Sequence, residues 1–184
     1  FEKISGDWFV GSYAKKYGDM QMTIKNGVYI WDVTDSKSFT QATDFYKGNE
    51  IKDFDIYVDI KFIKDAIKGA ACGGFFFRRP SNEWNDGAYT FTICDDSRFE
   101  IYLYKDKRWQ NITFVEYESS IRRSDWNRIE INAREDHFTF TINNKDVFEM
   151  NDNRLGKGNL GLIIDIDEDN ATEIWFDNFG YQPR

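Results

Sequence analysis

The chain has 184 residues, of which 41% are hydrophobic and 18% aromatic, so it can bury one sizeable core and does not have the composition of a disordered chain. Its formal net charge of −8, with basic residues interleaved among acidic ones, excludes a nucleic-acid-binding class that relies on a concentrated basic surface. No run approaches the roughly 18 apolar residues that a membrane-spanning helix needs, so we expect no membrane span.

The organisation of the chain predicts one domain over residues 1–184, because no repeat, low-complexity tract or linker divides it. The first residue, Phe1, is not an initiator methionine, and we expect a domain excised from a larger protein with other domains attached. The N-terminus therefore gives no information about localisation.

Apolar and polar residues alternate along most of the chain, and this period of two predicts β-strands. The alternation is unbroken in Asp53–Phe62, where one face is entirely apolar. We expect further strands at Phe75–Arg79, Tyr89–Cys94, Phe99–Tyr104, Arg128–Arg134, His137–Asn143, Asn159–Asp165 and Ile174–Tyr181. Turn signals such as Asn26-Gly27 and Asn143-Asn144 separate them. The sequence therefore predicts an all-β fold, with two antiparallel sheets packed as a β-sandwich or jelly roll.

The two cysteines fall nearly opposite each other if residues 70–79 and 88–94 form a hairpin around the turn at 80–87. Directly opposed residues have Cβ atoms about 4.5–5.5 Å apart, which is somewhat long for a disulfide but adjustable. Two alternatives stay open: Cys72 and Cys94 form a disulfide, or both are small buried residues with free thiols.

Four segments occur in an order that resembles the C-terminal half of the concanavalin A-like (laminin G-like) jelly-roll superfamily. They are Trp126–Ile131, His137–Phe148, Gly158–Leu162 and Phe176–Gly180. Upstream, Phe54–Phe62 and Cys72–Tyr104 are similar to the paired strands that precede them in that superfamily. The hairpin that is usually Asn-Gly reads Asn143-Asn144 here, a small departure because asparagine tolerates positive φ.

This resemblance implies several functional classes on one scaffold. They include carbohydrate-binding modules (family 66, for fructans, is one), glycoside hydrolases, 3-keto-disaccharide hydrolase-like enzymes, and adhesion or spacer domains. It also implies an extracellular or cell-surface location and admits a structural Ca²⁺. A fold cannot choose among these classes, so the site residues must do so.

Catalytic residues are hard to find in this sequence. The Glu-x-Asp-x-x-Glu strand of the family 16 glycoside hydrolases is absent, and the nearest substitute is Asp53, Asp55 and Asp59 on one strand face, with Asp55 and Asp59 as the candidate pair. Aspartates beside lysine and arginine more often form a solvated ion-pair face. The single histidine, His137, has no visible triad partners, and we interpret it as a surface or turn residue.

An acidic segment near the C-terminus suggests a metal site. Asp165, Asp167 and Asp169 are spaced at i, i+2 and i+4, and carboxylate oxygens suit Ca²⁺, with Asp177 as a further candidate. The spacing does not match an EF-hand, because Asn170 and Phe176 occupy the positions that need glycine and glutamate. A solvated loop between strands is the other interpretation.

Sugar recognition combines aromatic faces with a few directed polar groups, and this sequence offers both. The candidate ligand-binding residues are Arg78, Arg79, Trp84, Asp86, Tyr89, Tyr102, Tyr104 and Trp109. Strand alternation groups Arg79 with Phe75 and Phe77 and predicts that one of the two arginines leaves the core face. Tyr102 and Tyr104 should face outward, opposite the apolar side of their strand.

The sequence therefore favours a non-catalytic carbohydrate-binding module for an oligo- or polysaccharide, serving as an accessory domain. Two alternatives remain. One is a glycoside-acting enzyme that uses Asp55 and Asp59, and the other is a structural or sensory ectodomain whose partner is another protein domain.

Overall fold

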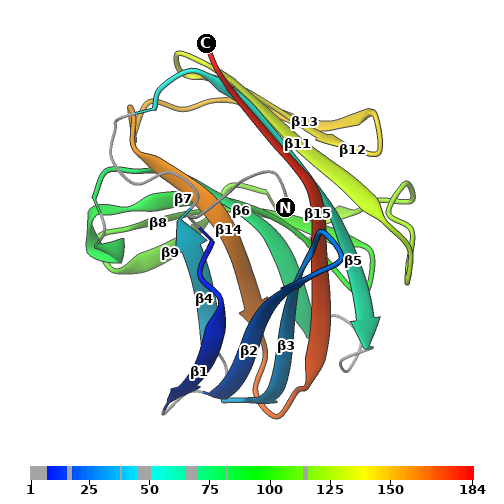
Figure 1. Cartoon of the computed structure of the whole chain (residues 1–184). Helices are drawn as coiled ribbons and strands as arrows, with labels where there is room; N and C mark the ends of the chain where they lie inside the picture. Colours follow the sequence, from blue (N-terminus) through cyan, green and yellow to red (C-terminus); the bar gives the residue numbers. More distant parts are fainter. Residues whose placement is uncertain are drawn as a thin grey trace.

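A computed structural model describes residues 8–15, 18–37, 39–44, 51–64, 70–81, 83–113 and 116–184. The described chain is built from antiparallel strands in two sheets, which Figure 1 shows curving past each other as two layers. The only helical element described is a 3₁₀ turn, η1, at Trp84–Asp86, and no described helix has the length and apolar character needed to cross a membrane. The predicted two-sheet antiparallel sandwich is confirmed.

The first sheet has eight strands in the order β1-β2-β3-β15-β5-β11-β12-β13. Their bounds are β1 Gly11–Lys15, β2 Gly18–Lys25, β3 Val28–Ser36, β15 Thr172–Pro183, β5 Phe54–Lys64, β11 Asn127–Arg134, β12 His137–Ile142 and β13 Lys145–Asn151. The second sheet has seven strands, in the order β10-β8-β7-β6-β14-β4 with β9 paired to β8. Their bounds are β10 Glu116–Tyr117, β8 Arg98–Lys105, β7 Ala88–Cys94, β6 Ala71–Arg79, β14 Asn159–Ile166, β4 Phe39–Asp44 and β9 Arg108–Asn111.

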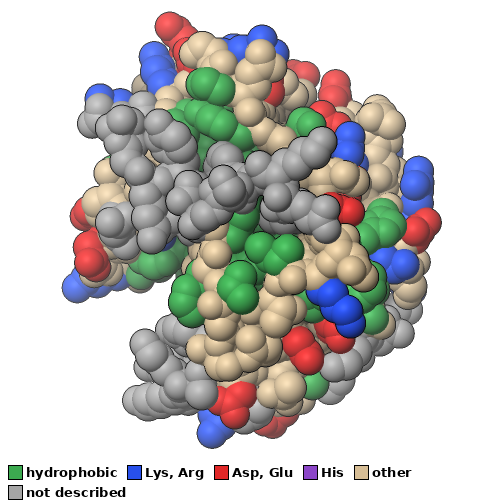
Figure 2. Space-filling view, in the orientation of Figure 1, with side chains coloured by type: hydrophobic (Ala, Val, Ile, Leu, Met, Phe, Trp, Pro, Cys, Tyr) green, Lys and Arg blue, Asp and Glu red, His purple; other side chains and the backbone are tan. Residues whose placement is uncertain are grey.

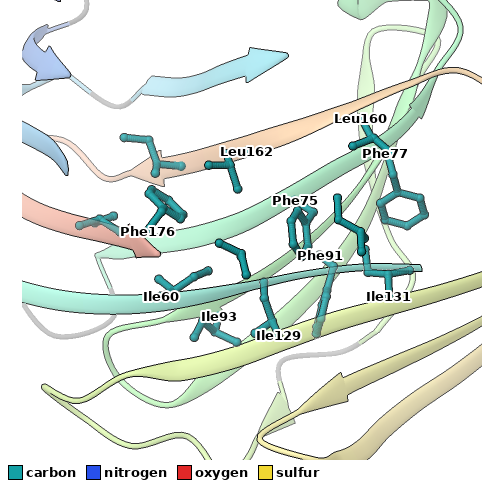
Figure 3. Packing of buried hydrophobic residues seen from close by; sticks show 14 of the residues in the cluster. Ile60, Phe75, Phe77, Phe91, Ile93, Ile129, Ile131, Leu160, Leu162 and Phe176 are labelled. Atoms are coloured by element: carbon teal, nitrogen blue, oxygen red, sulfur yellow. The ribbon is translucent and has the colours of Figure 1, made fainter. Parts of the chain in front are cut away.

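The core fills the space between the two sheets. Figure 3 shows Phe75, Phe91 and Leu162 of the seven-stranded sheet facing Ile60 and Ile129 of the eight-stranded sheet, and all five are fully buried. The period-two patterns therefore place one side of each strand inside, which leaves the alternate residues to form two outer faces.

The Cys72–Cys94 alternatives are resolved in favour of the disulfide. The two residues are directly paired in the register of β6 and β7, and they form a disulfide with Cα atoms 4.0 Å apart. Both belong to the alternation that faces away from the core. The disulfide therefore ties two neighbouring strands together on the outer face of the seven-stranded sheet.

The expected alternation of the two arginines is wrong, because β6 contains a bulge. Phe76 pairs with Gly161 and Arg79 pairs with Asn159, so two residues of β6 stand opposite one residue of β14. Arg78 takes the extra place with a φ of 51°. The bulge reverses the faces: Arg78 turns into the interior, and Arg79 lies with Phe76 on the outer face.

Candidate functional site

A hollow of about 230 Å³ lies on the outer face of the seven-stranded sheet. Its lining residues are Thr40 of β4, Thr90 and Thr92 of β7, Glu100 and Tyr102 of β8, Trp109 of β9, and Ile163 and Asp165 of β14. On β7, β8 and β14 these residues alternate with the core residues, so they face away from the core. The hollow thus collects side chains from segments far apart in the sequence.

The floor of the hollow is a row of residues that cross the sheet from strand to strand. Ile163 pairs with Gly74, Gly74 with Thr92, and Thr92 with Glu100. Gly74 fits here because an added Cβ would lie 2.0 Å from the carbonyl oxygen of Phe91 on β7. The row therefore has no side chain at its centre, while the buried Ile163 and Thr92 lie on either side.

Two carboxylates line the hollow. Asp165 accepts a hydrogen bond of 2.9 Å from the Thr40 hydroxyl, and Glu100 forms an ion pair of 2.9 Å with Arg98. Protein atoms packed around both groups raise their pKa values by desolvation, although Asp165 keeps contact with solvent through the hollow. The Thr40 hydrogen bond and Arg98 act in the opposite direction, and the charge of Asp165 further raises the pKa of Glu100.

Tyr102 and Trp109 line the hollow on the side of β8 and β9, and their rings belong to a cluster with Tyr104 and Trp84. We call these four residues the aromatic wall. The ring of Trp109 lies 4.9 Å from that of Tyr104, 6.0 Å from that of Tyr102 and 6.3 Å from that of Trp84. Trp109 is 46% exposed, so much of its ring is accessible to a ligand. The structure thus brings together four of the eight candidate ligand-binding residues.

Arg79 and Asp86 lie beside this wall but do not line the hollow. The Arg79 guanidinium lies 4.6 Å from the centre of the Phe76 ring and 5.5 Å from that of Trp84, and its side chain is buried. Asp86, on η1, is exposed and accepts a 2.6 Å hydrogen bond from the Ser81 hydroxyl. These contacts position Trp84.

Arg78 and Tyr89 lie in the interior, away from the hollow. Arg78 is 1% exposed, its guanidinium packs 4.4 Å from the centre of the Phe138 ring, and it donates to backbone carbonyls of three loops. Tyr89 is fully buried and stacks on Phe77, and its hydroxyl accepts a hydrogen bond from the Leu155 N–H. We therefore leave both residues out of the site.

The aspartates considered for catalysis lie on the outer face of the other sheet. Asp55 pairs with Arg134 and Arg184, and Asp59 accepts two hydrogen bonds from Arg128, at 2.7 and 3.0 Å. Hydrogen bonds from the two arginines lower the pKa of Asp55, although desolvation acts against them. Asp55 and Asp59 therefore belong to an ion-pair face, which was the alternative to a catalytic role in the sequence analysis.

The proposed metal ligands do not converge. Asp165 faces the hollow, Asp167 and Asp169 are exposed beyond the end of β14, and Asp177 lies on β15 of the other sheet. Within the described residues, the one cluster with metal-ligand spacing is Cys72, Cys94 and Glu100, and its sulfurs are joined in the disulfide. Among the described residues, no cluster of three or more potential ligands includes any of the four aspartates, and Ca²⁺ binding stays a prediction.

Sequence reasoning missed Thr40, Thr90, Thr92, Glu100 and Ile163 as lining residues. Glu100 shares the outward alternation of Tyr102 and Tyr104, so the same pattern could have identified it. Thr90 and Thr92 alternate in the same way with core residues of β7. Ile163 alternates in the same way with core residues of β14, but its apolar side chain hid this position. Thr40 carried no such signal, because its place depends on the pairing of β4 with β14, which are far apart in the chain.

Comparisons with known proteins identify the sequence family and show the same fold in several solved structures. Residues 2–180 match the family model described as the 3-keto-alpha-glucoside-1,2-lyase-like domain. No curated protein matches the sequence significantly.

Three solved structures illustrate the fold. The carbohydrate-binding module CBM66 from Bacillus subtilis is 14% identical with a TM-score of 0.59, and the match covers 95% of this chain and 92% of that one. A laminarinase catalytic domain from Thermotoga petrophila RKU-1 is 10% identical with a TM-score of 0.61, covering 94% and 82%. A Bacillus subtilis protein with a galectin-like fold is 10% identical with a TM-score of 0.65, covering 91% and 87%. At these identities the likeness establishes the jelly-roll fold alone.

Proposed function

Since the chain belongs to the 3-keto-alpha-glucoside-1,2-lyase-like domain family, we propose that it binds a saccharide in the hollow on the outer face of its seven-stranded sheet. One observation carries this proposal: the accessible ring of Trp109, the ring of Tyr102 and a set of hydroxyl and carboxylate groups line the same hollow. Aromatic faces pack against the C–H faces of a sugar ring, and polar groups at fixed positions select its hydroxyls.

The size of the hollow favours a short ligand segment. Pockets for drug-sized ligands measure about 300–1,000 Å³, and this hollow of about 230 Å³ is smaller. One sugar unit would occupy it, and a neighbouring unit would lie along Trp109 towards Trp84. The disulfide supports an extracytoplasmic setting, because disulfides persist in oxidising compartments.

The binding proposal is tested by calorimetric titration with neutral oligosaccharides, including α-glucosides, fructans and β-glucans. We expect Trp109→Ala to weaken binding about tenfold, equivalent to about 1.4 kcal/mol. Tyr117→Ala is the matched control, because Tyr117 is an exposed aromatic residue of the same sheet that does not line the hollow. If no saccharide binds, or if both variants weaken binding equally, the proposal is wrong.

A second candidate function is the elimination reaction named by the family. In a 3-keto glucoside the hydrogen on C2 is acidic because the neighbouring C3 is a ketone, so a base can remove it while the C1 substituent leaves. Glu100 and Asp165 favour this candidate, because two carboxylates whose pKa values are raised face one hollow and can serve as base and acid.

The two candidates are separated by incubating the protein with a 3-keto α-glucoside and following release of the C1 substituent by mass spectrometry. If the domain is catalytic, Glu100→Gln and Asp165→Asn will each lower turnover at least a hundredfold while saccharide binding persists. If the substrate binds and is recovered intact, the non-catalytic binding module is supported. Release that survives both substitutions would exclude these carboxylates as the acid and base.

A further inference from the structure

The charged groups around the hollow are mostly carboxylates. Among the residues that line it, as far as the chain is described, Glu100 and Asp165 carry charge and there is no lysine, arginine or histidine. Asp96 and Asp167 are close enough to act electrostatically on Glu100. The nearby cation, Arg98, pairs with Asp96 at 2.6 Å and with Glu100 at 2.9 Å. A second guanidinium, that of Arg123, donates to the backbone carbonyl of Asp96 at 3.1 Å but does not line the hollow. Among these groups, carboxylates therefore outnumber guanidinium groups by four to two.

The carboxylates also make the hollow rich in hydrogen-bond acceptors. A carboxylate offers about four acceptor sites and no donor. The Thr40 hydroxyl donates to Oδ1 of Asp165 and the backbone of Ile166 also hydrogen-bonds to this carboxylate, which nevertheless stays exposed and lines the hollow. A ligand therefore meets strong acceptors, to which sugar hydroxyls and ammonium groups can donate and to which a second carboxylate cannot.

Building on the saccharide binding proposed above, we infer that the hollow ranks its ligands by charge: a cationic amino sugar binds more tightly than its neutral parent, and a neutral sugar more tightly than an acidic one. Asp165 is the main specificity residue, because it faces the hollow without an arginine or lysine partner among the described ion pairs. Unit charges about 4 Å apart interact by roughly 1 kcal/mol in water and by more where protein replaces solvent.

The test uses three ligands that differ only at C6: methyl 6-amino-6-deoxy-α-glucoside, methyl α-glucoside and methyl α-glucuronide. Titrations are done at pH 7 in low salt. We expect dissociation constants to rise about fivefold at each step along this series, which corresponds to about 1 kcal/mol per step. The ratios between successive dissociation constants should become smaller at 0.5 M NaCl, because salt screens exposed charges.

Two variants test whether the charge of Asp165 causes the order of the dissociation constants. Asp165→Asn keeps an oxygen that can accept from Thr40 but removes the charge, so the three dissociation constants should converge to within about twofold. Glu149→Gln is the control, because it makes the same change in net charge on the exposed edge strand β13 of the other sheet. This control should preserve the order. A cooperative thermal unfolding transition above the titration temperature would confirm that each variant is folded.

The outcomes are distinct. The expected order, lost in Asp165→Asn and kept in Glu149→Gln, supports the inference. Equal affinities for the three ligands, tighter binding of the glucuronide, or equal effects of the two variants would overturn the inference while leaving saccharide binding intact. If none of the three ligands binds and the oligosaccharide panel also fails, the proposed function fails and the inference with it.

Discussion

At the scale of single residues, Arg78 determines how the end of β6 is arranged. Its guanidinium donates to the carbonyl oxygens of Leu155 at 3.2 Å and Lys52 at 2.9 Å, and also to that of Glu135. A buried cation needs such acceptors, because burial without hydrogen bonds costs several kcal/mol. Arg78 therefore joins three loops from inside the sandwich, and the bulge it occupies directs Arg79 towards Trp84.

Substitutions at Arg78 separate its two roles. Arg78→Ala removes the guanidinium and leaves three carbonyls without this donor, so we expect a loss of about 3 kcal/mol in unfolding free energy. Arg78→Gly loses the same bonds but relieves the left-handed backbone, which costs a non-glycine residue about 1–2 kcal/mol. The glycine variant should therefore be about 1 kcal/mol more stable than the alanine variant in urea unfolding. Equal stabilities would contradict the role given to the positive φ.

At the scale of elements, alternation predicted eight of the fifteen described strands, namely β5, β6, β7, β8, β11, β12, β14 and β15, and it did not predict several of their pairings. The alternation in Asp53–Phe62 identified β5 because one face of that strand is entirely core. It failed at β6 because a bulge inserts one residue, and alternation has no means to detect that insertion. The pairing of β4 with β14 was also invisible, because hydrogen bonds between distant strands leave no local pattern.

The β6–β7 pair is the element that the disulfide stabilises. Cys72 and Cys94 are 22 residues apart, and closing a loop of this length stabilises a fold by about 3 kcal/mol through the unfolded chain. We therefore expect the Cys72→Ala/Cys94→Ala variant to lose about 3 kcal/mol in unfolding free energy and so to unfold at a lower urea concentration. Reductant should destabilise the wild type and leave the double variant unchanged. A wild-type protein that is insensitive to reductant, with two thiols reactive after unfolding without reductant, would exclude the disulfide.

At the scale of the whole molecule, the two outer sheet faces differ in whether their aspartates are paired with arginine. On the eight-stranded sheet, Asp55 and Asp59 are each bonded to arginine. On the seven-stranded sheet, Asp165 faces a hollow beside an aromatic wall. Figure 2 shows acidic and basic side chains interspersed on the face in view, as the sequence composition predicts. Composition therefore revealed the mixed surface, but only the folded topology shows which carboxylates are paired with cations.

This contrast predicts opposite effects of one substitution on the two faces. The folded state lowers the pKa of Asp55 below its unfolded value, so its ionised form stabilises the fold above that value, near 4. Asp55→Asn should therefore lower the melting temperature at pH 7, and the difference should disappear as pH falls through the folded pKa of Asp55.

For Asp165 the sign is reversed. The folded state raises the pKa of Asp165, so ionisation opposes folding above that raised value, and the penalty is absent below the unfolded pKa near 4. Asp165→Asn should therefore raise the melting temperature at pH 7, with no gain near pH 3. A carboxylate kept where it destabilises the fold is expected at a site selected for binding or chemistry. If Asp165→Asn lowers the melting temperature at pH 7 as Asp55→Asn does, Asp165 is a structural residue and the hollow loses its main specificity group.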